Sequence, residues 1–139
     1  MIKYLEPTAE SGRDFMMRGI EGKVVMLNLL RFRAMADYSA TPELAPEEPI
    51  TGEAAYRIYV DHTRPLLQQS GGDLLFLGRG GGFLIGPADE HWDAAILVEQ
   101  SSVTTFIAFA SNNDYLSGMH HRTAALEDSR LLPLEEFDW

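Results

Sequence analysis

The 139-residue sequence contains no cysteine. This absence excludes disulfides, thiolate nucleophiles and cysteine-ligated zinc or iron–sulfur sites. Basic residues are also scarce, because 11 lysines and arginines stand against 21 acidic residues and leave a net charge of −10. Nucleic-acid binding needs a basic surface to neutralise phosphates, and anionic membranes attract basic segments. We therefore expect neither a nucleic acid nor a membrane as partner.

Long apolar runs are missing too. The longest uncharged stretch, residues 100–113, is rich in serine, threonine and asparagine and does not suit a membrane span. The first residues lack the apolar run of a signal peptide, so the expected location is cytoplasmic. The length suits a single domain, 1–139, and the 45% of apolar residues is enough to fill a core.

Apolar periodicity and capping residues predict an alternation of strands and helices. A helical extension, 1–22, is expected first, with its helix over residues 8–19. The remaining predicted elements are a strand at 23–33, a helix at 51–69, strands at 73–79 and 91–100, two helices after residue 101 and a short strand at 129–134. Thr8, Thr51 and either Ser101 or Ser102 are the expected helix caps.

Two connecting segments stand out. Residues 34–50 hold three prolines and three glutamates and predict an acidic, Pro-rich extended loop, for which a lid over a site is one interpretation. Gly80, Gly81 and Gly82 are expected to interrupt the second strand as a bulge, and residues 83–86 to continue it.

The element order β-α-β-β-α-(α)-β is that of an α+β, ferredoxin-like fold with an antiparallel sheet. Its helices cover one face of the sheet. The strand at 23–33 is apolar on both faces, which predicts that the second face is buried as well. A twofold-related copy of the same sheet is the simplest cover, so a homodimer is expected.

Several chemical motifs are absent. The glycines around Arg79 match neither a dinucleotide nor a phosphate loop, and no nucleophile elbow is present. The four histidines lack the i, i+4 spacing of helical metal sites. We therefore predict no metal and no cofactor.

Polar residues within apolar surfaces are the candidates for function. Asn28 interrupts an apolar strand, where it either bonds to backbone or points into a ligand cavity. Arg122 lies on an apolar helical stripe and either pairs with a carboxylate, with Glu99 the candidate, or clamps a ligand oxygen. Arg31 and Arg79 are edge residues or line a cavity.

Several separated motifs resemble the bacterial domain-of-unknown-function family 1330, which belongs to the dimeric α+β barrel superfamily. They are Met26–Arg33, Tyr56-x-x-Tyr59, Gly71-Gly72, Trp92, Tyr115 and His121–Leu131. The family commonly has Glu-Gly before the tryptophan, where this chain has Glu90-His91. The resemblance implies a dimeric barrel but no established activity. Relatives in the superfamily include cofactor-independent monooxygenases, isomerases and haem-binding or stress-responsive proteins.

Two hypotheses for function follow. In the first, the protein binds a small carbonyl or aromatic metabolite and acts as a cofactor-independent isomerase, lyase or monooxygenase. His121, Tyr59 and Arg122 would then be catalytic. Ligand-binding residues would be Asn28, Arg31, Arg79 and Trp92. In the second, the chain is a non-catalytic ligand-binding or structural homodimer, whose polar residues satisfy one another.

Overall fold

The computed structural model of the chain describes residues 2–138. Within them, four strands form one antiparallel sheet in the order β2-β3-β1-β4. The strands are β1 (Val24–Phe32), β2 (Asp73–Gly82), β3 (His91–Gln100) and β4 (Leu126–Glu135). The helices are α1 (Ala9–Met17), α2 (Gly52–Gln69), α3 (Val103–Ala110) and α4 (Asn113–Ala125), with a 3-10 turn η1 (Pro42–Leu44). The predicted ferredoxin-like order is confirmed.

The helices begin at the residues that local chemistry predicts. The side chain of Thr8 accepts a hydrogen bond from the Ser11 amide, and Ser11 reciprocates in a capping box. The side chains of Thr51 and Ser102 cap α2 and α3 by accepting hydrogen bonds from the amides of Ala54 and Thr105. Each cap satisfies an amide that the helix itself leaves without a partner.

The core lies between the sheet and helices α2 and α4. Alternate residues of β1 point into it, and Val24, Met26 and Leu30 are at most 2% exposed. Leu30 packs in one cluster with Ala55 of α2 and Ala124 of α4. Burying a leucine side chain in this way contributes about 1.5–3 kcal/mol to folding.

Helices α2 and α4 approach each other closely at a glycine. A Cβ atom on Gly118 would lie within about 2.2 Å of the His62 ring. The same ring makes a 2.7 Å hydrogen bond from Nε2 to the carbonyl oxygen of Asp114. A larger residue at position 118 would therefore push α2 and α4 apart.

The predicted break in β2 is wrong. The strand runs through all three glycines to Gly82, and residues 83–86 lie in the hairpin turn instead of continuing it. The register irregularity falls earlier, between Leu74 and Phe76. Gly80 passes so close to β3 that a Cβ there would lie 2.4 Å from the Trp92 carbonyl oxygen. The glycine thus permits pairing rather than interrupting it.

The acidic loop, residues 34–50, includes the 3-10 turn η1 and is tied to the core. The amide of Ala36 donates to the carbonyl of Ile50, and that of Asp37 donates to the carbonyl of Ala124, both at 2.9 Å. Tyr38 is 8% exposed and belongs to the core cluster.

The last strand begins earlier than predicted, since Leu126 belongs to β4 and not to the preceding helix.

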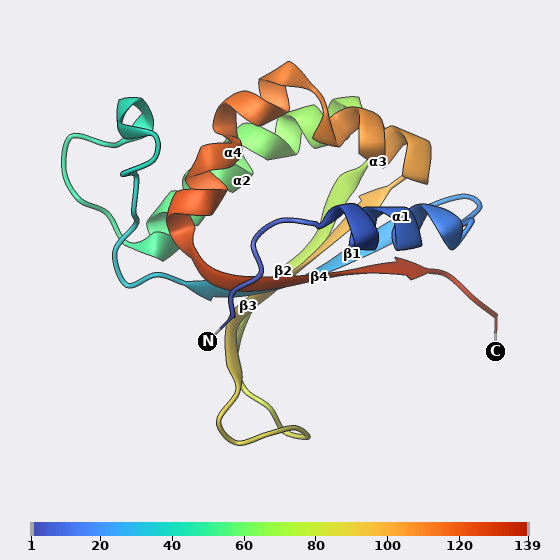
Figure 1. The fold of residues 1–139 in the computed structure, drawn as a ribbon, viewed down its shortest axis with the longest axis horizontal. Helices are drawn as coiled ribbons and strands as arrows, with labels where there is room; N and C mark the ends of the chain where they lie inside the picture. Colours follow the sequence, from blue (N-terminus) through green and yellow to red (C-terminus); the bar gives the residue numbers. More distant parts are fainter. Residues whose placement is uncertain (1, 139) are drawn as a thin grey trace.

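The helices lie on one side of the sheet, and the other side is open (Figure 1). Cross-strand register places Val25, Leu27 and Leu29 of β1 on this open face. Phe76 of β2 and Leu132 and Leu134 of β4 also lie on it and are 58%, 53% and 37% exposed. The β2–β3 hairpin bends to the same side (Figure 1). Leu84 at its tip is fully exposed.

Among residues 2–138, each helix is either too short or too polar to span a lipid bilayer.

Candidate ligand site

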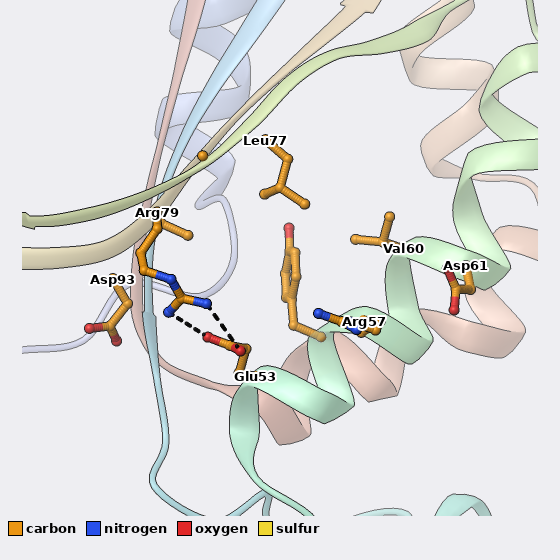
Figure 2. Close-up of a pocket in the computed structure, with 10 residues that line it drawn as sticks. Glu53, Arg57, Val60, Asp61, Leu77, Arg79 and Asp93 are labelled. Atoms are coloured by element: carbon orange, nitrogen blue, oxygen red, sulfur yellow. Dashed lines mark hydrogen bonds and ion pairs between the residues drawn. The ribbon is translucent and has the colours of Figure 1, made fainter.

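A cavity of about 430 Å³ lies between α2 and the strands β2 and β3 (Figure 2). Its wall is apolar and aromatic on one side and charged at the rim. The lining residues are Glu53, Tyr56, Arg57, Val60, Asp61, Leu77, Gly78, Arg79, Asp93 and Ala94. A volume of this size suits a small organic molecule, and a few polar groups in an apolar wall are typical of such sites.

An ion pair crosses the rim of the cavity. Arg79 of β2 donates two hydrogen bonds to the carboxylate of Glu53 on α2, at 2.9 and 3.4 Å. Figure 2 shows the two side chains pointing toward one another. The hydrogen bond from Arg79 holds the pKa of the Glu53 carboxyl below its usual range, and the same bond raises the pKa of Arg79. Both groups are therefore fully charged at neutral pH.

Tyr56 forms the aromatic wall. It is 5% exposed, and burial raises the pKa of its phenol to about 12, although the charge of Arg122 opposes the rise. The phenol stays protonated at neutral pH. It is therefore suited to donate a hydrogen bond to a ligand oxygen and not to accept a proton.

Tyr59 lies behind Tyr56, with ring centroids 5.3 Å apart. Its hydroxyl is 3.0 Å from that of Tyr115 on α4. Burial raises the pKa of Tyr59 well above its ordinary value, and the neighbouring phenols add to the effect. Tyr59 does not line the cavity, so it would affect a ligand only indirectly, through its contact with Tyr56.

Arg122 does not form the predicted pair with Glu99. It donates instead to the carbonyl of Leu5 at 2.9 Å and, more weakly, to the Ser129 hydroxyl at 3.4 Å. Glu99 lies 3.7 Å from Lys23. The sheet register explains the error, because Glu99 sits opposite Val25 at the far end of β1 from the residues that contact Arg122.

Asn28 and His121 are both held by protein groups. Asn28 is 8% exposed, and its amide nitrogen lies 3.4 Å from the carbonyl oxygen of Met26, a long hydrogen bond. The Nδ1 atom of His121 is 2.7 Å from the Tyr38 hydroxyl. Burial lowers the pKa of His121, and the nearby His62 and His120 lower it further. His121 therefore fastens the acidic loop to α4.

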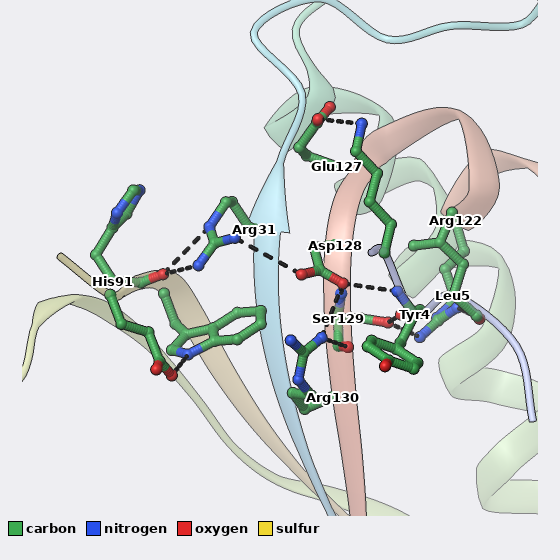
Figure 3. Close-up of polar contacts among 12 residues, drawn as sticks. Tyr4, Leu5, Arg31, His91, Arg122, Glu127, Asp128, Ser129 and Arg130 are labelled. Carbon is green, nitrogen blue, oxygen red and sulfur yellow. Dashed lines mark hydrogen bonds and ion pairs between the residues drawn. The ribbon is translucent and has the colours of Figure 1, made fainter. Parts of the chain in front are cut away.

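Arg31 and Trp92 meet in a separate cluster (Figure 3). The Arg31 guanidinium lies 4.4 Å from the Trp92 ring centroid, and that of Arg130 lies 5.0 Å from it. Arg31 also donates to the His91 carbonyl and lies 3.7 Å from the buried carboxylate of Asp128. Such contacts between guanidinium groups and an indole are attractive.

Asp128 is the anchor of this cluster, and it is 2% exposed. It accepts hydrogen bonds at 2.8 Å from the amides of Tyr4 and Ser129 and from Arg130. Burial alone would raise the pKa of Asp128, but these hydrogen bonds outweigh it and lower the pKa. The carboxylate thereby ties the N-terminal segment to β4.

The seven residues predicted for function thus fall in three places. Arg79 lines the cavity, and Arg31 and Trp92 belong to the Asp128 cluster. The other four, Asn28, Tyr59, His121 and Arg122, form hydrogen bonds to protein groups outside the cavity lining. Sequence reasoning missed Glu53 and Arg57. Their signal was the i, i+4 spacing along α2, beside the apolar stripe that carries Tyr56.

Within the described part of the chain, no three histidine, aspartate or glutamate side chains gather closely enough to hold a metal ion.

Comparison with solved structures gives close matches. The RPA0582 protein, described as a protein of unknown function from Rhodopseudomonas palustris, is 34% identical with a TM-score of 0.83, and the alignment covers 99% of each chain. Its methylated form is 35% identical with a TM-score of 0.85, covering 99% of this chain and 98% of that one.

A more distant match bears on the fold alone. A dimeric protein of unknown function with a ferredoxin-like fold, from Bacteroides fragilis, is 13% identical with a TM-score of 0.51, covering 84% of this chain and 99% of that one. No protein-family model matches the sequence, so membership of family 1330 stays a prediction. No curated protein matches it either.

Proposed function

We propose that this chain, which belongs to the same family as the RPA0582 protein of Rhodopseudomonas palustris, is a homodimer that binds a small carbonyl or aromatic metabolite in the α2–β2 cavity. The observation that carries the proposal is the cavity itself. Leu77, Val60 and the Tyr56 ring give it an apolar wall, and Arg79 places a guanidinium at its rim. An apolar pocket with few polar groups is the usual form of a small-molecule site.

The surface area of the chain supports a dimer. The chain exposes 9095 Å², whereas a compact monomer of 15.5 kDa would expose about 7,200 Å². The excess, about 1,900 Å², is larger than the roughly 800 Å² that each partner buries in a stable interface. A second copy on the open face would cover much of this excess.

The chemistry of the open face supports the same arrangement. The sheet register places an apolar row side by side across all four strands, formed by Phe76, Leu97, Leu27 and Leu132. The β2–β3 hairpin bends to the same side (Figure 1), and Leu84 and Ile85 in its turn are 100% and 92% exposed. Contiguous exposed apolar surface of this kind is typical of protein–protein contact sites. The Bacteroides fragilis protein of the same fold is described as dimeric, which agrees with this assembly.

A second candidate function is proton transfer on the bound molecule without a cofactor, as in an isomerase or lyase. The protonated phenol of Tyr56 favours it, because a hydrogen bond from this group would polarise a ligand carbonyl. Arg122 and Tyr59 would then act as positioning residues behind Tyr56. Against catalysis by His121 stands its bond to Tyr38, which directs its Nδ1 atom toward the acidic loop.

Binding is tested with acetophenone, a neutral aromatic ketone, by NMR of methyl groups. We expect shifts of the Leu77 and Val60 methyls and none of the Leu84 methyls at the hairpin tip. Val60→Phe should fill the cavity and abolish the shifts. Ile58→Phe, a substitution at an α2 residue outside the cavity lining, is the matched control. Shifts spread evenly over the protein, or unchanged by Val60→Phe, would contradict the proposal.

A further inference from the structure

Glu53 occupies the place that an acidic ligand would take. Its carboxylate binds the Arg79 guanidinium through two parallel hydrogen bonds at the cavity rim (Figure 2). This fork arrangement is the one by which arginine recognises any carboxylate, whether it belongs to the protein or to a ligand. The internal pair therefore marks a carboxylate position beside the apolar wall.

The Glu53 carboxylate can also be replaced on Arg79 at little cost in stability. The side chains of Arg79 and Glu53 are 74% and 44% exposed, so water competes for both. Exposed ion pairs contribute little to stability because solvent screens them. Replacing the Glu53 carboxylate by another one at Arg79 conserves the two hydrogen bonds, and Glu53 returns to water from the first turn of α2.

A second guanidinium lies at the same cavity. Arg57 follows Glu53 by one helical turn, and its charge helps to lower the pKa of the Glu53 carboxyl, so it already acts on a carboxylate at this position. It is therefore available to an anion in the cavity. Of the other two carboxylates there, Asp93 accepts a hydrogen bond from the Phe32 amide, and its charge also raises the pKa of Arg79. Asp93 and Asp61 add negative charge to the lining, which disfavours a dianion relative to a monoanion.

We infer that the cavity selects small monocarboxylates with an aromatic or branched apolar body, whose carboxylate replaces Glu53 on Arg79. This inference rests on the proposed ligand-binding function. The carboxylate lies between Arg79 and Arg57, and the apolar body packs on Leu77, Val60 and the Tyr56 ring.

The test compares benzoate with its neutral isostere benzamide by NMR titration of the full chain. We expect benzoate to bind at least about 10-fold more tightly, as is typical when a bidentate guanidinium contact is present in only one of two ligands. Arg79→Gln should remove this preference. Glu53→Gln should have the opposite effect and tighten benzoate binding, because the competing carboxylate is gone. Arg64→Gln alters an exposed arginine paired with Asp73 outside the cavity and is the control.

The results distinguish a failure of the carboxylate inference from a failure of the proposed ligand-binding function. Equal affinity for benzoate and benzamide, or weaker benzoate binding by Glu53→Gln, overturns the carboxylate inference, and the proposed function stands if acetophenone still shifts the Leu77 methyls. If acetophenone, benzoate and benzamide all leave the cavity methyls unmoved, the proposed function itself is overturned. Circular dichroism of each variant shows that the fold is retained.

Discussion

The two faces of the sheet have similar apolar residues and opposite surroundings. On one face, Leu30 is completely buried by α2 and α4. On the other, the neighbouring Leu29 lies in a row with Leu27 and Leu132, and helices do not cover this row (Figure 1). Successive residues of a strand point to opposite faces, so β1 contributes apolar side chains to both faces of the sheet.

The difference shows what the chain supplies by itself and what it lacks. The covered face is closed by helices α2 and α4, which the apolar periodicity and the capping residues of the sequence predict. The open face retains Phe76, Leu132 and Leu134 at 37–58% exposure, and it has no cover within residues 2–138. If a second copy provides that cover, substitutions on the two faces should differ in how their effects depend on protein concentration.

The largest effect is expected from a charge on the open face. Leu132→Asp places a carboxylate where the second copy would pack, and a buried charge without a partner costs about 4 kcal/mol, or roughly a thousandfold in the dimer dissociation constant. Sedimentation velocity should show a monomer at micromolar concentration. Leu131→Asp is the matched control, because Leu131 is next in the strand, similarly exposed at 47%, and on the other face. Equal weakening by both variants would argue against an interface on the open face.

A smaller effect is expected from truncating the buried leucine of β1. Leu30→Ala should lower the free energy of unfolding by about 3 kcal/mol, since it removes a fully buried side chain and leaves a cavity. Leu29→Ala should cost less, and its cost should shrink as the protein is diluted. Urea unfolding at two protein concentrations measures both. A loss for Leu29→Ala that is the same at both concentrations would contradict the comparison.

The smallest effect is expected on the pH dependence of stability, from His121 of α4 on the covered side of the sheet. Burial lowers the pKa of His121 in the folded chain below 6.5, so the unfolded chain takes up this proton at a higher pH. The folded state should therefore lose stability as the pH falls through about 6.5, and the loss should level off below the folded pKa. His121→Gln should make the free energy of unfolding less dependent on pH between 7 and 5. Identical slopes for the two proteins would show that His121 does not contribute.

Local features of the sequence were sufficient to predict the fold. Thr8 and Thr51 cap helices through contacts within three residues, and β1 alternates over a single strand. The course of β2 depends instead on a contact between strands. Gly80 continues the strand because it passes the Trp92 carbonyl, a neighbour twelve residues away that local propensity does not include.

The candidate site was predicted only in part, for a similar reason. Arg79 was expected either at a sheet edge or in a cavity wall. Its partner Glu53 comes from α2, and the contact between them depends on how that helix lies on the sheet. Arg122 was expected to need a partner. The Leu5 carbonyl that it contacts belongs to the N-terminal segment, whose path no periodicity describes.

The central claim is that the open face is an interface between two copies of the chain. The most direct test is the molar mass of the protein at micromolar concentration, measured by light scattering as it elutes from a size-exclusion column. We predict a mass twice that of the 15.5 kDa chain. A single species of 15.5 kDa, unchanged as the concentration rises, would contradict the account.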